Sequence, residues 1–114
     1  MPESPHIRTD RPEPHIAVVV FDRPEKRNAF DLAMWETLGA VMRRLSDDAS
    51  LRCVVLRGAG AEAFSAGADI SAFETERGTR EKEDHYGEVL HQTFQTLRTC
   101  RHPTVAMIRG VCIG

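Results

Sequence analysis

The sequence predicts an α/β fold, and three consecutive segments carry this prediction. Residues 16–21 and 52–57 are short apolar runs, typical of strands that are covered on both faces. Between them, residues 31–47 place apolar side chains three and four positions apart, which is typical of an amphipathic helix. A strand, a helix and a second strand of these lengths predict a right-handed crossover between parallel strands.

Composition narrows the class of protein further. The chain has 114 residues, of which 41% are hydrophobic and 28% charged, as is ordinary for one globular domain. A net charge of −2 supplies no basic field, so no nucleic-acid partner is expected. No apolar run is long enough to span a bilayer, so no membrane partner is expected either. Three cysteines without close pairing, with Cys53 and Cys112 expected to be buried, favour reduced thiols and a cytoplasmic setting.

Two features define the start of the predicted domain. Residues 1–15 hold four prolines among charged side chains and are predicted to form a loose arm, which leaves 16–114 as the folded part. Asp31 precedes the first helix, where its carboxylate can accept the free N–H groups of the first turn. Trp35, Leu38, Met42 and Leu45 are expected to form the apolar face of that helix.

The run Phe-Ser-Ala-Gly-Ala-Asp-Ile, residues 64–70, follows the second strand and a glycine-containing turn. Small residues at four of its seven positions leave the main chain open to close approach by a ligand. Asp69 stands where a short helix could begin, and a helix start presents unpaired N–H donors to a negative group. The run therefore suits a substrate that develops an oxyanion.

The rest of the sequence again predicts a helix followed by a strand. Residues 74–84 are nearly all polar and predict a mobile surface loop that enters a helix near Arg80. That helix is expected to end before Pro103, and residues 104–108 predict a third strand. A second small-residue run, 110–114, follows this strand. Because such a run is expected to lead into further structure, the sequence is interpreted as the N-terminal portion of a longer chain. The inner face of the second helix is expected to consist of Tyr86, Leu90, Phe94 and Leu97.

Three motifs in a fixed order resemble the crotonase, or enoyl-CoA hydratase/isomerase, superfamily. They are the Arg-Pro…Asn-Ala loop at 23–29, the run 64–70 and the Gly-x-x-x-Gly segment 110–114, and the similarity extends from Ile16 to Gly114. The resemblance implies a spiral of ββα turns, of which this chain would be the N-terminal part, ending before the C-terminal helices. It also implies an active site for an acyl-CoA thioester, with coenzyme A entering as part of the substrate and no separate cofactor or metal.

The same resemblance assigns roles to individual residues. Ala68 matches the first oxyanion position, whose backbone N–H holds the thioester oxygen as it becomes enolate-like. Gly114 matches the first glycine of a triplet whose next residue gives the second donor, so Gly114 would lie near the oxyanion hole. Lys26 and Arg27 would meet the nucleotide end of coenzyme A, although two solvated surface charges remain the alternative. The residues implied to line the coenzyme A site are Ala66, Gly67, Ala68, Asp69 and Ile70.

The chemistry that follows thioester polarisation stays open. The two glutamates of hydratases would lie beyond Gly114, and isomerases, dehalogenases, decarboxylases and hydrolases on the same fold use other groups. The 114-residue chain alone is expected to be inactive, and a non-catalytic coenzyme A-binding or assembly module is the alternative from another class. The resemblance implies a homotrimer or a pair of trimers for the full-length protein.

Other local patterns could be taken for different kinds of site, and each has a simpler interpretation. Residues 58–63 nearly match a dinucleotide fingerprint, but the run after them interrupts the helix that such a site needs. Ser65 lacks the glycine two residues earlier that a nucleophile elbow requires, so a hydrogen bond within its loop is expected. His85 lies where some superfamily members carry a catalytic base, with a surface histidine as the alternative. The spacing of His85 and His91 does not suit a metal site on one helical face.

Overall fold

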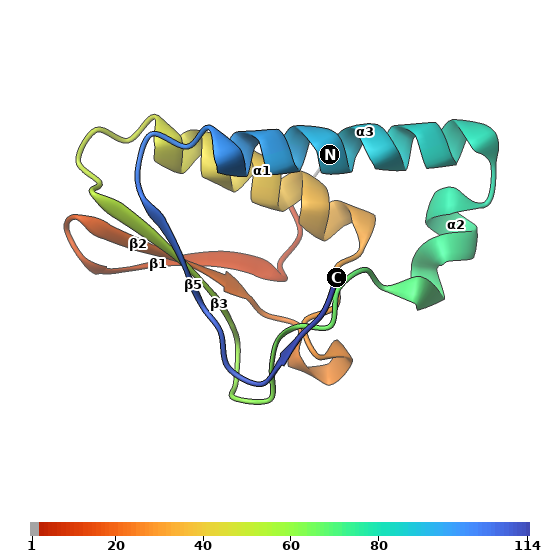
Figure 1. Cartoon of the computed structure of the whole chain (residues 1–114), viewed down its shortest axis with the longest axis horizontal. Coiled ribbons are helices and arrows are strands. Elements are labelled where there is room, and N and C mark those ends of the chain that lie inside the picture. The colour runs from red at the N-terminus through yellow and green to blue at the C-terminus, as the bar shows by residue number, and fades with distance from the viewer. Residues whose placement is uncertain (1–2) are drawn as a thin grey trace.

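The computed structural model describes residues 3–114 and contains a mixed sheet covered by helices (Figure 1). The larger sheet has the strand order β1-β2-β3-β5, and a smaller sheet pairs β4 with β6. Strands β2, β3 and β5 are mutually parallel, which confirms the predicted crossover and the α/β class. The strands are β1 (Ile7–Glu13), β2 (Ile16–Phe21), β3 (Cys53–Gly58), β4 (Ala63–Ser65), β5 (Thr104–Met107) and β6 (Val111–Cys112).

Helices cover one face of the large sheet in two layers. In Figure 1, α1 lies against the sheet and α3 runs over α1, while the short α2 lies beyond the end of the sheet. Asp31 caps α1 as predicted, because its carboxylate accepts the Met34 N–H at 2.9 Å. The helices are α1 (Leu32–Ser46), α2 (Phe73–Arg77) and α3 (Arg80–Arg98), with 3-10 turns η1 (Pro24–Lys26) and η2 (Ile70–Ala72).

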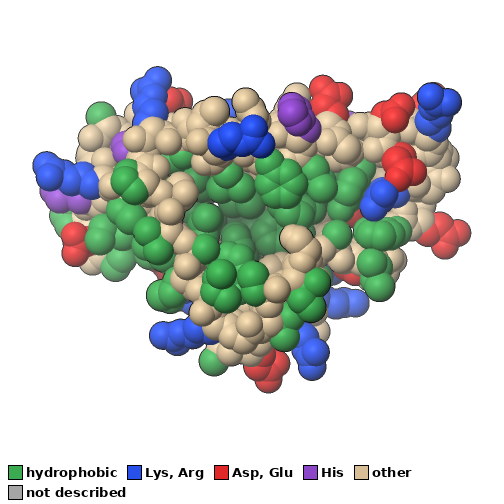
Figure 2. Space-filling view, in the orientation of Figure 1, with side chains coloured by type: hydrophobic (Ala, Val, Ile, Leu, Met, Phe, Trp, Pro, Cys, Tyr) green, Lys and Arg blue, Asp and Glu red, His purple; other side chains and the backbone are tan. Residues whose placement is uncertain are grey.

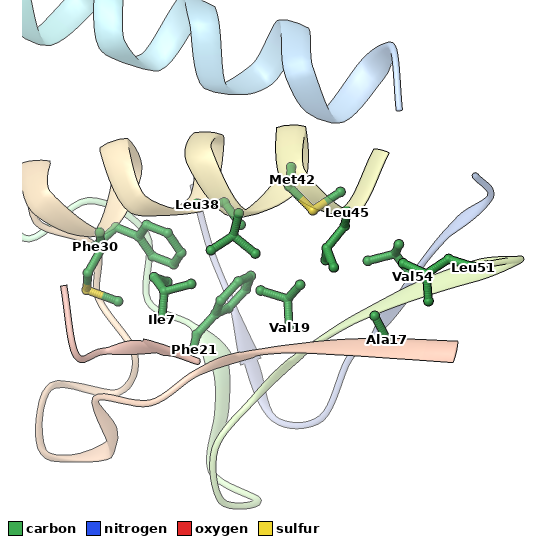
Figure 3. Packing of buried hydrophobic residues seen from close by; sticks show 12 residues of the cluster. Ile7, Ala17, Val19, Phe21, Phe30, Leu38, Met42, Leu45, Leu51 and Val54 are labelled. Carbon is green, nitrogen blue, oxygen red and sulfur yellow. The ribbon is translucent and has the colours of Figure 1, made fainter. Parts of the chain in front are cut away.

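The hydrophobic core fills the space between α1 and the large sheet. Figure 3 shows Leu38 and Met42 of α1 directed toward Phe21 and Val19 of β2. Each of these four side chains is at least 96% buried. Burial of this kind is the main favourable term in folding, and here it fixes the strand ends from which the site loops emerge.

The prediction of a loose arm over residues 1–15 is wrong for most of that segment. Residues 7–13 form β1, which pairs antiparallel with β2, and Ile7 lies opposite Phe21 in this ladder. Pro12 is tolerated because β1 is an edge strand, where a missing N–H donor costs little. The backbone N–H of Ser4 also donates to the Thr37 hydroxyl at 2.8 Å. Residues 1 and 2 lie outside the described residues.

Two further expectations are corrected by the structure. The polar segment 74–84 is not simply a loop, because α2 occupies Phe73–Arg77 and α3 begins at Arg80. A five-residue helix is too short to show a helical period in the sequence. Cys112 is exposed and Cys53 is only partly buried, although both stand in apolar runs. Within residues 3–114, no helix has the length and apolar character needed to cross a membrane.

Candidate active site

The Arg-Pro…Asn-Ala loop and the 64–70 run lie side by side and are joined through their backbones. Phe30 N–H donates to the Gly67 carbonyl at 2.8 Å, and Asp69 N–H donates to the Phe30 carbonyl at 2.8 Å. Ala66 N–H donates to the Arg27 carbonyl at 3.0 Å. Two segments that are about forty residues apart in sequence therefore form one parallel pairing, centred on Phe30 and Ala68.

This pairing leaves the N–H of Ala68 open. Phe30 bonds to the residues on either side of Ala68, so the Ala68 N–H is directed away from Phe30. Within residues 3–114 this N–H makes no hydrogen bond, whereas the N–H groups of Gly67 and Asp69 both have acceptors. Ala68 therefore presents a fixed donor that a ligand oxygen can use.

The glycine run at 110–114 packs against this donor. Ile113 N–H donates to the Ser65 carbonyl at 3.0 Å as β6 pairs with β4. A Cβ added at Gly114 would lie 3.0 Å from the Gly67 Cα and 3.9 Å from the Ala68 nitrogen. Gly67 itself has φ of +87°, and a Cβ there would lie 2.8 Å from the Ile113 carbonyl oxygen. Glycine at both positions lets the two main chains approach this closely.

Asn28 is a buried residue that joins the 23–29 loop to the turn before the 64–70 run, a role that the sequence alone did not indicate. Its side-chain amide donates to the carbonyls of Ala59 and Ala63 at 3.2 and 2.9 Å. Its side-chain oxygen accepts the Arg23 N–H at 2.9 Å. Asn28 is 1% exposed and has φ of +57°, a conformation that asparagine tolerates better than most residues. Its place in the Arg-Pro…Asn-Ala motif was the feature of the sequence that could have indicated this structural role.

Ser65 makes the local hydrogen bonds that the sequence predicted. Its hydroxyl donates to the Asn28 carbonyl at 2.8 Å and accepts the Gly67 N–H at 3.0 Å. The serine therefore joins the two loops as well as ordering its own. Because the hydroxyl is used in these two bonds and is buried, the structure gives it no role as a nucleophile.

An ion pair closes the outer side of the two loops. The Arg23 guanidinium donates to the Asp69 carboxylate at 3.0 Å and to the Ala29 carbonyl at 3.1 Å. The other carboxylate oxygen of Asp69 accepts from the Ser71 hydroxyl at 2.6 Å and the Ser71 N–H at 3.0 Å, which caps η2. Hydrogen bonds from Ser71, together with Arg23, hold the pKa of Asp69 below its usual range although burial opposes this.

Acid should therefore loosen this region through Asp69. A carboxyl whose folded-state pKa lies below its unfolded value stabilises the fold above the unfolded pKa, about 4. That stabilisation is lost as the pH falls through the lower folded-state pKa. We expect urea unfolding midpoints to fall between pH 5 and pH 3, and the fall to be smaller in D69N. An unchanged pH slope in D69N would show that Asp69 does not contribute.

An apolar cavity of about 530 Å³ opens beside Ala68. Figure 2 shows it as a hollow with a floor of hydrophobic side chains at the centre of the face. Aromatic and aliphatic side chains from α1, α3 and the sheet form most of the wall, and small residues of the two runs form the rest. Its lining includes Phe30, Trp35, Leu56, Leu90, Phe94 and Leu97 on the apolar side, and Gly67, Ala68 and Gly114 on the other.

The residues predicted for the coenzyme A nucleotide and chain lie on the outside of the same loops. Lys26 and Arg27 are exposed at the end of η1, and Arg27 has φ of +51°. Arg27 is joined to Ala66 by the backbone hydrogen bond described above. Ile70 is 76% exposed. The two cations and this apolar side chain thus flank the loops that carry Ala68.

The structure does not bring His85 to this cavity. Its side chain is 61% exposed on α3, with its Nε2 atom 3.8 Å from a carboxylate oxygen of Glu36 on α1. It lines a different hollow of about 380 Å³ between α1 and α3. His85 is therefore a surface histidine, as the alternative interpretation of the sequence expected, and its position does not support a role as the catalytic base. Residues 3–114 contain no group of three or more His, Cys, Asp or Glu side chains arranged to hold a metal ion.

Comparison with known proteins identifies this arrangement. The family model described as enoyl-CoA hydratase/isomerase matches residues 11–114. Among curated relatives, a putative enoyl-CoA hydratase from Thermus thermophilus is 38% identical over 102 residues, which is 88% of this chain and 40% of that protein. The mitochondrial Delta(3,5)-Delta(2,4)-dienoyl-CoA isomerase of Mus musculus is 31% identical over 117 residues, which is 95% of this chain and 36% of that protein.

Solved structures agree with the sequence comparison. An enoyl-CoA hydratase/carnithine racemase from Magnetospirillum magneticum superposes with a TM-score of 0.88 at 39% identity, covering 95% of this chain and 40% of that one. A putative enoyl-CoA hydratase/isomerase family protein from Hyphomonas neptunium gives the same TM-score at 32% identity. The predicted crotonase-like α/β fold is confirmed, and the chain spans less than half the length of these relatives. This chain belongs to the enoyl-CoA hydratase/isomerase (crotonase) family.

Proposed function

We propose that this chain binds an acyl-CoA thioester and that the Ala68 N–H donates to the thioester oxygen. The observation that carries the proposal is the open N–H of Ala68, which is fixed by the pairing with Phe30 and makes no hydrogen bond within residues 3–114. The apolar cavity that Ala68 lines is large enough for a short acyl chain. Within a chain of the relatives' length, this site would serve an enoyl-CoA hydratase or isomerase reaction.

The outer face of the loops supports the coenzyme A half of the proposal. Lys26 and Arg27 offer two exposed cations to the phosphates, and charge-assisted bonds to phosphate are among the stronger ones. The exposed Ile70 offers an apolar surface to the pantetheine arm. Ala66, Gly67 and Asp69 complete the wall between these residues and the donor, and the small side chains of Ala66 and Gly67 leave room for the pantetheine arm to approach.

The donor would act by stabilising charge that develops on the thioester oxygen. When a proton leaves the carbon next to the carbonyl, or water adds to a conjugated double bond, negative charge accumulates on that oxygen as an enolate. A donor already held in place needs little reorganisation, and loss of one such donor typically costs roughly 10²–10³ in rate. Gly114 lies beside this position, and the family resemblance implies that, in a chain of the relatives' length, the next residue would give a second donor.

Replacing Ala68 by lactic acid, which converts its amide to an ester, tests the donor directly. The change removes the N–H and keeps the shape of the side chain. We expect the unmodified chain to bind crotonyl-CoA more tightly than free coenzyme A, and the ester variant to lose about fivefold in affinity for crotonyl-CoA, the worth of one net hydrogen bond. Isothermal titration calorimetry with both ligands measures this.

The matched control is the same amide-to-ester exchange at exposed Ala49, in the turn after α1. It should leave both affinities unchanged. Equal loss of affinity for crotonyl-CoA and free coenzyme A in the Ala68 variant would contradict the thioester contact. Rapid hydration of crotonyl-CoA by the 114-residue chain alone would contradict its expected inactivity.

Assembly and location remain predictions. A homotrimer or pair of trimers, which the family resemblance implied, is proposed for a chain of the relatives' length and is measurable by light scattering. The cytoplasmic setting expected from the cysteines also stays a prediction, and the mouse relative carries the word mitochondrial in its name.

A further inference from the structure

We propose that Arg23 is a positioning residue that fixes the direction of the Ala68 N–H through Asp69. This inference rests on the proposed function of Ala68 and adds a residue that acts through Asp69 rather than as a donor itself. Arg23 lies at the start of one loop, and Asp69 directly follows the donor in the other. Their side chains join the two loops at 3.0 Å.

The geometry makes Arg23 a two-sided clamp. The same Arg23 nitrogen, Nη1, donates to the Ala29 carbonyl and to the Asp69 carboxylate. Ala29 precedes Phe30, and Phe30 makes the backbone bonds on both sides of Ala68. Arg23 thus fixes the partner segment and the segment that carries the donor relative to each other. The next nearest carboxylate, on Asp31, lies 4.0 Å from the same nitrogen.

Burial shows that this ion pair is not an incidental surface contact. The Arg23 and Asp69 side chains are 14% and 8% exposed, whereas Arg8 and Asp22, paired at the same 3.0 Å, are 42% and 37% exposed. Exposed pairs contribute little, while breaking a buried pair leaves an uncompensated charge. Hydrogen bonds from Ser71 further restrict the Asp69 carboxylate to one orientation, and the depressed pKa of Asp69 agrees with that arrangement.

Native-state hydrogen exchange of the 114-residue chain, followed by NMR, tests the clamp without ligand. The Asp69 N–H reports opening of the pairing with Phe30, and the Val54 N–H, bonded to the Pro103 carbonyl in the sheet, reports global opening. We expect R23M to speed exchange at Asp69 by about tenfold, as loss of a charge-assisted hydrogen bond predicts, with a smaller change at Val54. R23K, which keeps the charge but not the planar fork, should fall between R23M and the unmodified chain.

Matched variants separate positioning from simple stabilisation. R8M removes the exposed ion pair with Asp22 and should leave Asp69 exchange unchanged. D69N should mimic R23M, and the double variant should add little, because both single changes remove the same contact. Equal acceleration at Asp69 and Val54 would overturn the proposal. If R23M does not fold, R23K and D69N decide the question by the same comparison.

A ligand readout connects the clamp to the donor. In the unmodified chain, crotonyl-CoA should shift the Ala68 amide resonance more than free coenzyme A does. In R23M that difference should largely vanish while affinity for free coenzyme A stays within about twofold. A full thioester-dependent shift in R23M would overturn the proposal. If the unmodified chain shows no such difference, the proposed function fails, and the exchange comparison at Asp69 still decides the role of Arg23 as a clamp.

Discussion

Asn28→Ala should lower the free energy of unfolding by about 4 kcal/mol, the largest stability effect expected of a single change near the site. The substitution removes the partner of one buried carbonyl, of one part-buried carbonyl and of one part-buried N–H, and an unsatisfied buried group costs about 1–3 kcal/mol. Alanine also tolerates the positive φ of this position poorly, which adds about 1 kcal/mol. Urea unfolding followed by circular dichroism at 25 °C measures the loss.

Two further variants make the Asn28 experiment decisive. N28G removes the same hydrogen bonds but relieves the backbone strain, so it should be about 1 kcal/mol more stable than N28A. Q92A changes an exposed amide on α3 and should stay within about 0.5 kcal/mol of the unmodified chain. A loss below about 1 kcal/mol in N28A would show that neighbouring groups replace the Asn28 amide.

Substituting Lys26 and Arg27 together by glutamine should weaken coenzyme A binding by about 30-fold. Two charge-assisted contacts to phosphate would be lost, while side chains of similar length would remain. Such contacts are screened by salt. The difference from the unmodified chain should therefore shrink as the ionic strength rises from about 0.05 to about 0.5 M, because the Debye length falls from about 14 to about 4 Å. Calorimetric titration with coenzyme A gives both quantities.

The matched control for the Lys26 and Arg27 variant is another adjacent pair of exposed cations. R43Q/R44Q changes net charge by the same amount on α1, away from the site loops, and should leave coenzyme A affinity within about twofold. Titration with 3′-dephospho-coenzyme A shows whether the cations meet the ribose phosphate or the diphosphate. Equal weakening by both double variants would favour the alternative reading of Lys26 and Arg27 as ordinary surface charges.

The sequence predicted those parts of the fold whose signal is local and periodic. The strand at 16–21 and the helix after Asp31 appear with nearly the expected bounds, because continuous apolar runs and a 3–4 spacing each suit one kind of backbone. The strand β1 escaped prediction, since its charged and proline-containing sequence is acceptable only at a sheet edge beside β2. The short α2 escaped because five residues show no period.

For the candidate site, the sequence by itself predicted which segments would form it and which residues they carry. Small residues at 64–70, an Arg-Pro…Asn-Ala loop and a glycine run were visible as motifs, and their order indicated the family. Only the tertiary structure decided that the three segments meet, that the Ala68 N–H makes no hydrogen bond within the part of the chain that is described, and that His85 lies outside the cavity. Contacts between residues far apart in the chain leave no local pattern. The hydrogen bonds by which Asn28 and Arg23 hold these segments together are therefore visible only in the folded structure.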